Sequence, residues 1–273
     1  MPVGEYTMQG GAAEEHRLAV LAQVMSEPTT QLFTEIGVSD GWECLDVGSG
    51  GGQVSMALAE MVAPTGSVTG VDIGETTVLH AEETARDSGV ANVRFERADV
   101  YALPYRDRFD LAYARLLLCY LTEPVTALRQ MGAAVRPGGV VAVEDLFTDS
   151  LRSDPPTPAL DDLRRVYGAT VRAHGGDPTI GPRLPAMFRA AGFTDVHASS
   201  VVNVLDTPEK KGFLVTMVES MRQATLDAGA ASADELESMA AAIKAAADDP
   251  GCTFYQARIF QVFGRRASTL RAV

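Results

Sequence analysis

The sequence predicts a doubly wound α/β fold, in which helices cover both faces of a largely parallel β-sheet. From Trp42 onward, short β-branched runs alternate with amphipathic helical stretches. Such alternation is typical of parallel strands joined by right-handed crossovers. A glycine-rich loop at residues 48–52 follows the first of these strands. In open α/β sheets, ligands bind at this carboxyl edge of the strands.

The first half of the chain contains five expected strands and three expected helices. The strands are Glu43–Val47, Ser67–Asp72, Val93–Ala98, Phe109–Tyr113 and Val140–Glu144. The helices, predicted from apolar periodicity, are Gln53–Val62, Glu75–Ser88 and Pro124–Val135. The turn Pro137-Gly138-Gly139 introduces the fifth strand.

After Asp145 the pattern changes to longer helical stretches. The expected elements are a helix from Pro158 to about Ala173, a short helix at Pro182–Ala191, a strand at Thr194–Leu205, two helices, and a last strand at Thr253–Phe263. The second of the two late helices opens with the capping box Ser232–Glu235. We therefore expect an N-terminal helical lid at 1–34, a core at 35–205 and 252–266, and a helical lid at 206–251.

Composition narrows the class of protein. The 273 residues are 46% hydrophobic and 22% charged, an ordinary soluble composition, and the net charge of −13 disfavours nucleic acid and acidic membranes. No apolar run approaches the ~18 residues of a membrane span. Three cysteines without a CxxC pair, and acids spread over separate strands, predict neither a disulfide framework nor a metal site. We expect a cytoplasmic protein, and its apolar terminal helices are compatible with a homodimer.

The glycine loop distinguishes two classes of nucleotide site. The dinucleotide pattern GxGxxG requires a glycine where this chain has Gln53, whereas DxGxGxG is matched fully by Asp46, Gly48, Gly50 and Gly52. No Gly-Lys-Ser/Thr follows, which excludes a P-loop. A carboxylate before the loop would repel a pyrophosphate but suits a ligand with an ammonium group. An NAD(P)-dependent oxidoreductase is therefore the alternative rather than the first interpretation.

Two further carboxylates end the next strands. Asp72 lies 22 residues after Gly50, where an acid can bind both ribose hydroxyls. Asp99 ends the third strand and can accept from an adenine amino group, while the Val100 amide meets a ring nitrogen. Both acids could instead cap the following turns. Three carboxylates at successive strand ends fit a nucleoside without phosphate.

These residues resemble the class I S-adenosylmethionine-dependent methyltransferases, in particular the small-molecule group of menaquinone-type and natural-product tailoring enzymes. The resemblance extends from about Leu18 to Phe193. Beyond the glycine loop it is carried by Val71-Asp72, Arg97-Ala98-Asp99-Val100, Phe109-Asp110-Leu111, the stretch from Arg115 to Pro124, and Arg136-Pro137-Gly138-Gly139. It implies a Rossmann-like seven-stranded sheet whose last strand is antiparallel. It also implies S-adenosylmethionine as cofactor and S-adenosylhomocysteine as product.

Departures from the family pattern bear on the acceptor. Many relatives carry a histidine where this chain has Tyr120, and the aromatic N-terminal box of the menaquinone enzymes is absent, which disfavours a quinone. The arginine- and alanine-rich composition and the long lid resemble actinobacterial tailoring enzymes. Those act on phenols, amines or electron-rich carbons such as an indole ring.

The candidate site residues follow from the motifs and the resemblance. The cofactor-binding candidates are Asp46, Gly48, Ser49, Gly50, Gly52, Asp72, Ile73, Asp99, Val100 and Arg115. The candidate general bases are His16, His174, Glu144 and Tyr120, and the candidate substrate contacts are Tyr6, Asp145, Phe213 and Met217. The helical spacing of Phe213 and Met217 equally predicts a core face.

The expected function is transfer of a methyl group to a small, aromatic secondary metabolite by in-line displacement at an oxygen, nitrogen or carbon atom. The protein would mainly hold the reactants in line within a dry pocket. A non-catalytic protein that binds S-adenosylmethionine and kept the fold is a further alternative, since this fold needs no invariant catalytic residue.

Overall fold

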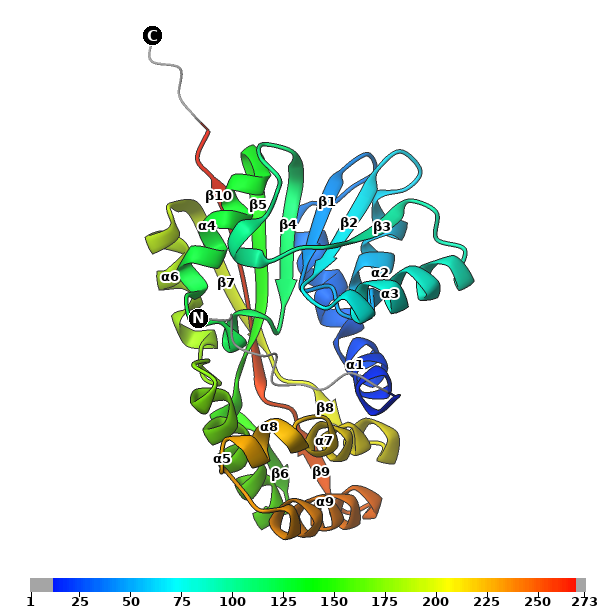
Figure 1. Cartoon of the computed structure of the whole chain (residues 1–273), viewed down its shortest axis with the longest axis vertical. Helices are drawn as coiled ribbons and strands as arrows, with labels where there is room; N and C mark the ends of the chain where they lie inside the picture. The colour runs from blue at the N-terminus through cyan, green and yellow to red at the C-terminus, as the bar shows by residue number, and fades with distance from the viewer. Residues whose placement is uncertain (1–11, 269–273) are drawn as a thin grey trace.

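A seven-stranded sheet forms the centre of the computed structural model, which describes residues 12–268 (Figure 1). Its strand order is β3-β2-β1-β4-β5-β10-β7. The strands are β1 Glu43–Val47, β2 Ser67–Asp72, β3 Val93–Arg97, β4 Phe109–Arg115, β5 Val135–Phe147, β7 Phe193–Val201 and β10 Arg258–Arg266. β1 to β5 pair in parallel, and β10 is antiparallel to both of its neighbours. The expected sheet, with an antiparallel last strand, is confirmed.

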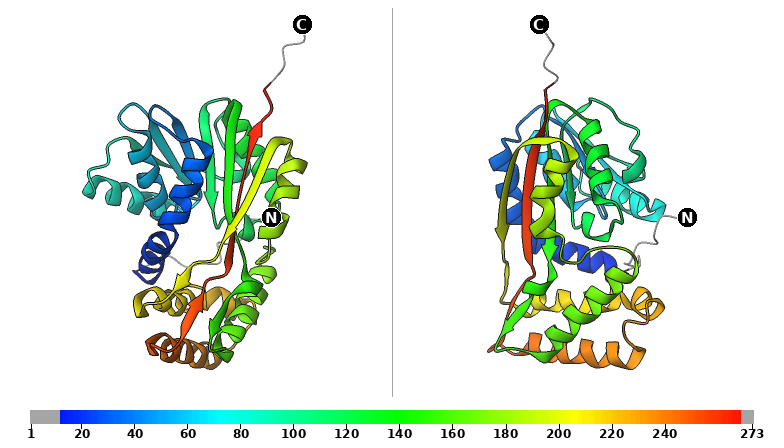
Figure 2. Two further views of the ribbon diagram at one scale, coloured as in Figure 1. Left: turned by 180° about the vertical axis from the view of Figure 1, so that it is seen from behind. Right: turned by 90° about the vertical axis from the view of Figure 1, so that its left-hand side faces the viewer.

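Helices cover both faces of this sheet (Figure 2). The C-terminal half of α1 (Ala12–Ile36) and α2 (Gln53–Val62) pack through Phe33 and Leu58 into one apolar core. On the other face, α4 (Pro124–Ala134) and α6 (Leu184–Ala191) pack through Met131 and Phe188. α3 (Glu75–Asp87) packs against Phe95 of β3. Burial of these stripes of apolar side chains stabilises the three-layer arrangement.

A small lobe lies beyond the carboxyl ends of the parallel strands (Figure 1). It combines the three-stranded sheet β6 (Arg152–Asp154), β9 (Thr253–Tyr255) and β8 (Val204–Leu205) with four helices. These are α5 (Pro158–Ala173), α7 (Pro208–Ser220), α8 (Arg222–Asp227) and α9 (Ala233–Asp248). The N-terminal half of α1 joins the same core through Leu21 and Met25. α1 therefore links the sheet to the small lobe.

The small lobe corrects three expectations. The strands expected at Thr194–Leu205 and Thr253–Phe263 are each divided in two, because β8 and β9 leave the main sheet and pair with each other. At the break, the Gln256 amide N–H donates to the Asn203 carbonyl at 2.9 Å and the two side chains bond at 2.8 Å. Three helices, not two, lie between β8 and β9. The predicted capping box of α9 is confirmed.

β5 (Val135–Phe147) is longer than the expected strand Val140–Glu144 at both ends, and its additional C-terminal residues pair with β10. It begins at Val135 and pairs with β10 as far as Phe147, opposite Arg258. In residues 12–268, none of the helices has the length and hydropathy needed to cross a membrane.

A buried lysine joins the elements of the small lobe. Lys211 of α7 is 1% exposed, and its Nζ donates to the carbonyls of Asp249 at 2.8 Å and Cys252 at 2.9 Å. The same ammonium lies 5.8 Å from the ring centroid of Phe254 on β9. Buried carbonyls without a partner are costly, so this side chain ties α7 to the end of α9 and to β9.

We expect Lys211→Met to lower the free energy of unfolding by about 2 kcal/mol or more, because it leaves two buried carbonyls without donors. The neighbouring Lys210 is the matched control, since its side chain is 37% exposed and pairs with Asp206 at 3.0 Å. Lys210→Met should change the free energy by less than ~0.5 kcal/mol. Urea unfolding of both variants checks this. Equal losses in the two would contradict the role of Lys211.

Candidate active site

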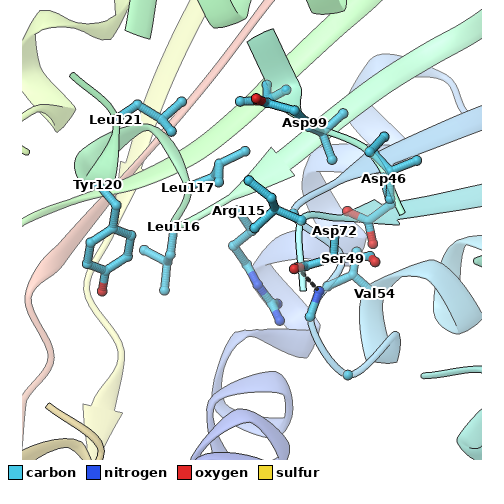
Figure 3. A pocket seen from close by; sticks show the side chains of 18 of the residues that line it. Asp46, Ser49, Val54, Asp72, Asp99, Arg115, Leu116, Leu117, Tyr120 and Leu121 are labelled. Atoms are coloured by element: carbon cyan, nitrogen blue, oxygen red, sulfur yellow. Dashed lines mark hydrogen bonds between the residues drawn. The ribbon is translucent and has the colours of Figure 1, made fainter. Parts of the chain in front are cut away.

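A cavity opens at the carboxyl ends of β1, β2 and β4 (Figure 3). All of the expected cofactor-binding residues except Gly52 line it: Asp46, Gly48, Ser49, Gly50, Asp72, Ile73, Asp99, Val100 and Arg115. His174 and Tyr120 line the same cavity. The structure thus brings together residues from five separate parts of the sequence.

The glycine loop has a left-handed backbone that only glycine adopts without strain. Gly48 has a φ of +73°, Gly50 of +52° and Gly52 of +82°. The N–H groups of Gly48 and Ser49 donate to the Val71 carbonyl at 2.8 and 3.0 Å, which fixes the loop to β2. Gly52 does not line the cavity within this geometry. A Cβ atom there would lie 2.6 Å from Cζ of Phe95, so packing of α2 explains this glycine.

Asp46 is a buried carboxylate in the floor of the cavity. It is 2% exposed, and the Ser55 hydroxyl donates to its Oδ2 at 2.6 Å. Burial raises the pKa of Asp46 to about 6, while the Ser55 hydrogen bond and the positive charge of Arg115 oppose the rise. Arg115 and Asp46 therefore offer opposite charges to one cavity, which suits a ligand carrying both an ammonium and a carboxylate group.

The other two carboxylates both cap local turns and line the cavity. Asp72 accepts from the Gly50 N–H at 3.2 Å and from the Gly74 N–H at 2.9 Å. Asp99 accepts from the Tyr101 N–H at 2.9 Å. The capping role considered from the sequence is confirmed for both, and each carboxylate still borders the cavity. Their backbone hydrogen bonds fix the direction in which the carboxylates face a ligand.

Ser49 is a further polar residue that lines the cavity beside Asp46 and Asp72. Its side-chain oxygen is buried and has no hydrogen-bond partner in the described part of the chain. Buried hydroxyls are normally paired, so the unsatisfied oxygen fits a site completed by a polar ligand. The wall formed by Asp46, Ser49 and Asp72 is opposite the side formed by Tyr120 and Leu121 (Figure 3).

The second side of the cavity is mostly apolar. Leu21, Leu116, Leu117, Leu121 and Val171 line it. These leucines, with Gly51, Tyr101 and Thr122, were not candidates from the sequence, because an apolar side chain that lines a pocket has the same pattern as one in the core. Such a surface accommodates the body of an apolar molecule.

Two polar side chains interrupt the apolar side. The Nδ1 atom of His174 lies 2.9 Å from the Thr170 carbonyl, which can only accept, so Nδ1 carries the proton in the neutral ring. The Nε2 atom then carries the lone pair and is available to a ligand. The hydroxyl of Tyr120 lies 2.9 Å from that of Tyr167.

Glu144 does not line the cavity and is buried with 0% exposure. Its Oε2 accepts from the Thr29 hydroxyl at 2.6 Å and from the Tyr113 hydroxyl, and its Oε1 accepts from Gln261 Nε2 at 2.7 Å. Gln261 also donates to the Pro28 carbonyl at 3.0 Å. These contacts fix the middle of α1 to the sheet, which favours a structural role for Glu144 over the expected role as a base.

Asp145, the next residue of β5, also has 0% exposure and does not line the cavity. It accepts from the Leu146 N–H at 2.9 Å and from the Cys119 N–H at 3.0 Å. Burial raises the pKa of Asp145 to about 6, although these N–H groups favour the ionised form. Asp145 thereby fixes the short helix Leu118–Tyr120 rather than contacting the cavity.

The same short helix holds the loop that carries His174. The Cys119 carbonyl accepts from the Asp177 N–H at 2.7 Å. A Cβ atom at Gly176 would lie 2.4 Å from the Cys119 carbonyl oxygen, so close approach requires glycine there. The backbone N–H and carbonyl of Cys119 therefore fix the positions of both Tyr120 and the turn that follows His174.

The remaining candidates lie elsewhere. Phe213 is 5% exposed in the core of the small lobe, Met217 packs against the same core, and neither lines the cavity. Their placement favours the core interpretation of that helical stripe. The backbone of His16 lies in α1, and Tyr6 lies outside the described residues. No group of three or more potential metal ligands occurs in the described part of the chain.

Comparison with known proteins identifies a methyltransferase domain in the chain. A family model described as a methyltransferase domain matches residues 39–172. The chain is 30% identical over 183 residues to the methyltransferase GfsG of Streptomyces halstedii, an alignment that covers 66% of this chain and 63% of GfsG. It is 29% identical over 138 residues to the demethylmenaquinone methyltransferase of Staphylococcus aureus, covering 50% of this chain and 54% of that enzyme.

Residues 39–172 of the chain therefore match a methyltransferase domain. The chain spans less than two thirds of the length of GfsG and of the staphylococcal enzyme. A solved S-adenosylmethionine-dependent methyltransferase from Aquifex aeolicus has a TM-score of 0.52 and 19% identity, over 72% of this chain and 93% of that one. This similarity supports the fold of the methyltransferase domain.

The residues of the methyltransferase domain fit S-adenosylmethionine. Its amino acid part carries the paired charges that Arg115 and Asp46 offer, and its nucleoside carries no phosphate. The unpaired hydroxyl of Ser49 leaves a hydrogen bond for such a ligand to complete. A dinucleotide fits less well, because Asp46 and Asp72 both lie beside the loop that a pyrophosphate would need.

The raised pKa of Asp145 predicts how the free energy of unfolding changes with pH. A carboxyl whose folded-state pKa lies above its unfolded value stabilises the fold fully below about pH 4, and this stabilisation is lost as the pH rises through about 6. Asp145→Asn removes that contribution. We expect the variant to lose about 1 kcal/mol more stability, relative to the natural protein, at pH 5 than at pH 7. Urea unfolding at both pH values measures this, and an equal loss at both would contradict it.

Proposed function

We propose that the protein is an S-adenosylmethionine-dependent methyltransferase that methylates a hydroxyl oxygen of a small, largely apolar molecule such as a phenol. The observation that carries the proposal is the position of His174, which lines the apolar side of the cavity with its Nδ1 atom 2.9 Å from the Thr170 carbonyl. In the neutral ring Nε2 can accept a proton from an acceptor hydroxyl.

The polarity of the two sides supports oxygen over nitrogen as the acceptor atom. The carboxylates that line the cavity, Asp46, Asp72 and Asp99, all belong to the side of the glycine loop. An aliphatic amine is an ammonium ion near neutral pH and would need a carboxylate or an aromatic cage on the other side. A hydroxyl is neutral, and it must lose its proton as it accepts the methyl group.

In this proposal each part of the cavity has one task. S-adenosylmethionine supplies an activated methyl group on a positively charged sulfur atom. Asp46 and Arg115 bind the ammonium and carboxylate of its amino acid part, Asp72 binds the ribose hydroxyls, and Asp99 with the Val100 N–H binds the adenine edge. His174 accepts the acceptor proton. The leucine side chains exclude water and hold the acceptor in line, which can supply ~7–11 kcal/mol.

The helical segments at 1–34 and 206–251 act as covers in this proposal. Leu21 of α1 lines the cavity, and α1 packs in one core with α5 and α7. Helices α7 and α9 pack against α1 and α5 and do not line the cavity. Phe213 and Met217 of α7 would affect the acceptor through the position of α1 and α5.

We expect affinity for S-adenosylhomocysteine to fall about tenfold between pH 7 and pH 5, because protonated Asp46 cannot pair with the ligand ammonium. Asp46→Asn should bind more weakly at pH 7 and lose most of this pH dependence. Calorimetric titration at pH 7, 6 and 5 tests both statements. An unchanged pH dependence in Asp46→Asn would assign the effect to another group.

His174→Ala should reduce kcat by about 10²–10⁴-fold while affinity for S-adenosylhomocysteine changes by less than about threefold. The assay follows transfer of a labelled methyl group to a panel of phenols and aliphatic alcohols. His80→Ala is the control, since His80 lies on α3 away from the cavity. Turnover by His174→Ala at the rate of the natural protein would overturn the role of this histidine.

A further inference from the structure

Leu116 has a backbone conformation that is costly for its residue type. Its φ is +51°, in the left-handed region. The other residues with a positive φ in residues 12–268 are glycines, Asp107 and Asp195. Aspartate tolerates this conformation and glycine adopts it freely, whereas a bulky side chain is strained there. Leu116 is therefore the exception in a chain that otherwise uses tolerant residues.

The surrounding contacts enforce this conformation. Leu116 follows Arg115, the last residue of β4, and its N–H donates to the Glu144 carbonyl at 2.8 Å. Glu144 is itself fixed through both side-chain oxygens. The left-handed residue turns the chain out of the sheet and into the short helix Leu118–Tyr120. A glycine would make the same turn without strain, so the turn alone does not explain a leucine.

The side chain of Leu116 lies where the two sides of the cavity meet. It is partly buried and lines the cavity between Arg115, on the cofactor side, and Tyr120, on the apolar side (Figure 3). The next residue, Leu117, has an ordinary φ of −110°, and its Cδ1 lies 3.1 Å from the position of a Cβ at Gly48. Leu117 thus packs on the glycine loop. The Leu116 side chain instead lines the part of the cavity between Arg115 and Tyr120, which we call the passage between the two sides (Figure 3).

We propose that Leu116 is a specificity-determining residue, and that its side chain limits the bulk that an acceptor can carry next to the reacting hydroxyl. The inference rests on the proposed function and makes it more specific. The pocket takes hydroxyls whose neighbouring positions are unsubstituted, such as phenols with free ortho positions. It excludes hydroxyls flanked by alkyl groups on both sides. The strained backbone persists because it directs the leucine side chain into this passage.

Two substitutions separate the strain from the packing. Leu116→Gly and Leu116→Ala both remove most of the side chain, but only glycine relieves the left-handed strain. The glycine variant should therefore have the higher midpoint of urea unfolding. At an ordinary position the order is the reverse, because glycine gains more entropy on unfolding than alanine. A higher midpoint for Leu116→Ala than for Leu116→Gly would contradict the inference that the backbone at Leu116 is strained.

The deciding experiment compares acceptors with the natural protein and both variants. The probes are a para-substituted phenol with free ortho positions and its 2,6-dimethyl counterpart, with labelled S-adenosylmethionine as donor. We expect the ratio of kcat/KM for the blocked over the free phenol to rise at least about tenfold in both variants, the usual effect of one or two methyl groups in a tight pocket. Affinity for S-adenosylhomocysteine should change by less than about threefold.

The control is Leu117→Ala, which shortens the neighbouring side chain on the glycine loop. It should weaken cofactor binding and change the ratio between the two phenols by less than about threefold, because the Leu117 side chain packs on Gly48. An unchanged ratio in the Leu116 variants, with active natural protein, would overturn the role of Leu116 alone. If the natural protein binds S-adenosylhomocysteine but methylates neither phenol, the proposed acceptor class fails and this inference fails with it.

Discussion

The site depends on two adjacent buried carboxylates of β5 that extend to opposite faces of the sheet. Glu144 holds α1 through Thr29, and Asp145 holds the Leu118–Tyr120 helix through the Cys119 N–H. Both are fully buried, and a buried charge is tolerated only when hydrogen bonds replace its hydration. Each carboxylate has several donors. Together they connect the sheet to α1 and to the Leu118–Tyr120 helix, which contribute Leu21 and Tyr120 to the lining of the cavity.

The two sides of the cavity are built in different ways. The cofactor side is local, since the glycine loop, Asp72 and Asp99 are held by backbone hydrogen bonds within their own turns. The acceptor side is assembled from segments that are distant in the sequence. Two of them, β5 and the turn after α5, are joined through hydrogen bonds to the backbone of Cys119. It follows that substitutions in the small lobe can change the acceptor side while the cofactor side keeps its geometry. Such separation suits a domain that combines one methyl donor with varied acceptors.

The local character of the cofactor side explains why the sequence predicts it well. Asp46, the glycines and Asp72 have fixed spacings within one strand–loop–helix unit, so the pattern carries their positions. Gly52 is the partial failure, because its requirement comes from Phe95, which is distant in sequence. The sequence also did not predict that the expected strands Thr194–Leu205 and Thr253–Phe263 are interrupted at Asn203 and Gln256. β-Propensity continues through these residues, and only their pairing in the fold shows the break.

The acceptor side was harder to predict for a related reason. Glu144 and Asp145 were expected at the end of the fifth strand, but β5 continues to Phe147, and their side chains bond to α1 and Cys119 instead of facing a ligand. Phe213 and Met217 show the ambiguity of an apolar helical stripe. The strain at Leu116 has no sequence signal at all, because a leucine after a strand is ordinary. His174 was one of two histidine candidates, and its hydrogen bond to Thr170 and its place in the cavity lining distinguish it from His16.

Hydrogen–deuterium exchange with and without S-adenosylhomocysteine tests the central assignment of this cavity most directly. The account predicts slower exchange on ligand addition in the segments that line the cofactor side, residues 46–54, 72–74 and 98–101, and in residues 116–122, which connect it to the acceptor side. The exposed edge strand β7 should be unchanged. Protection confined to other segments, or the same protection by NAD in place of S-adenosylhomocysteine, would contradict the assignment.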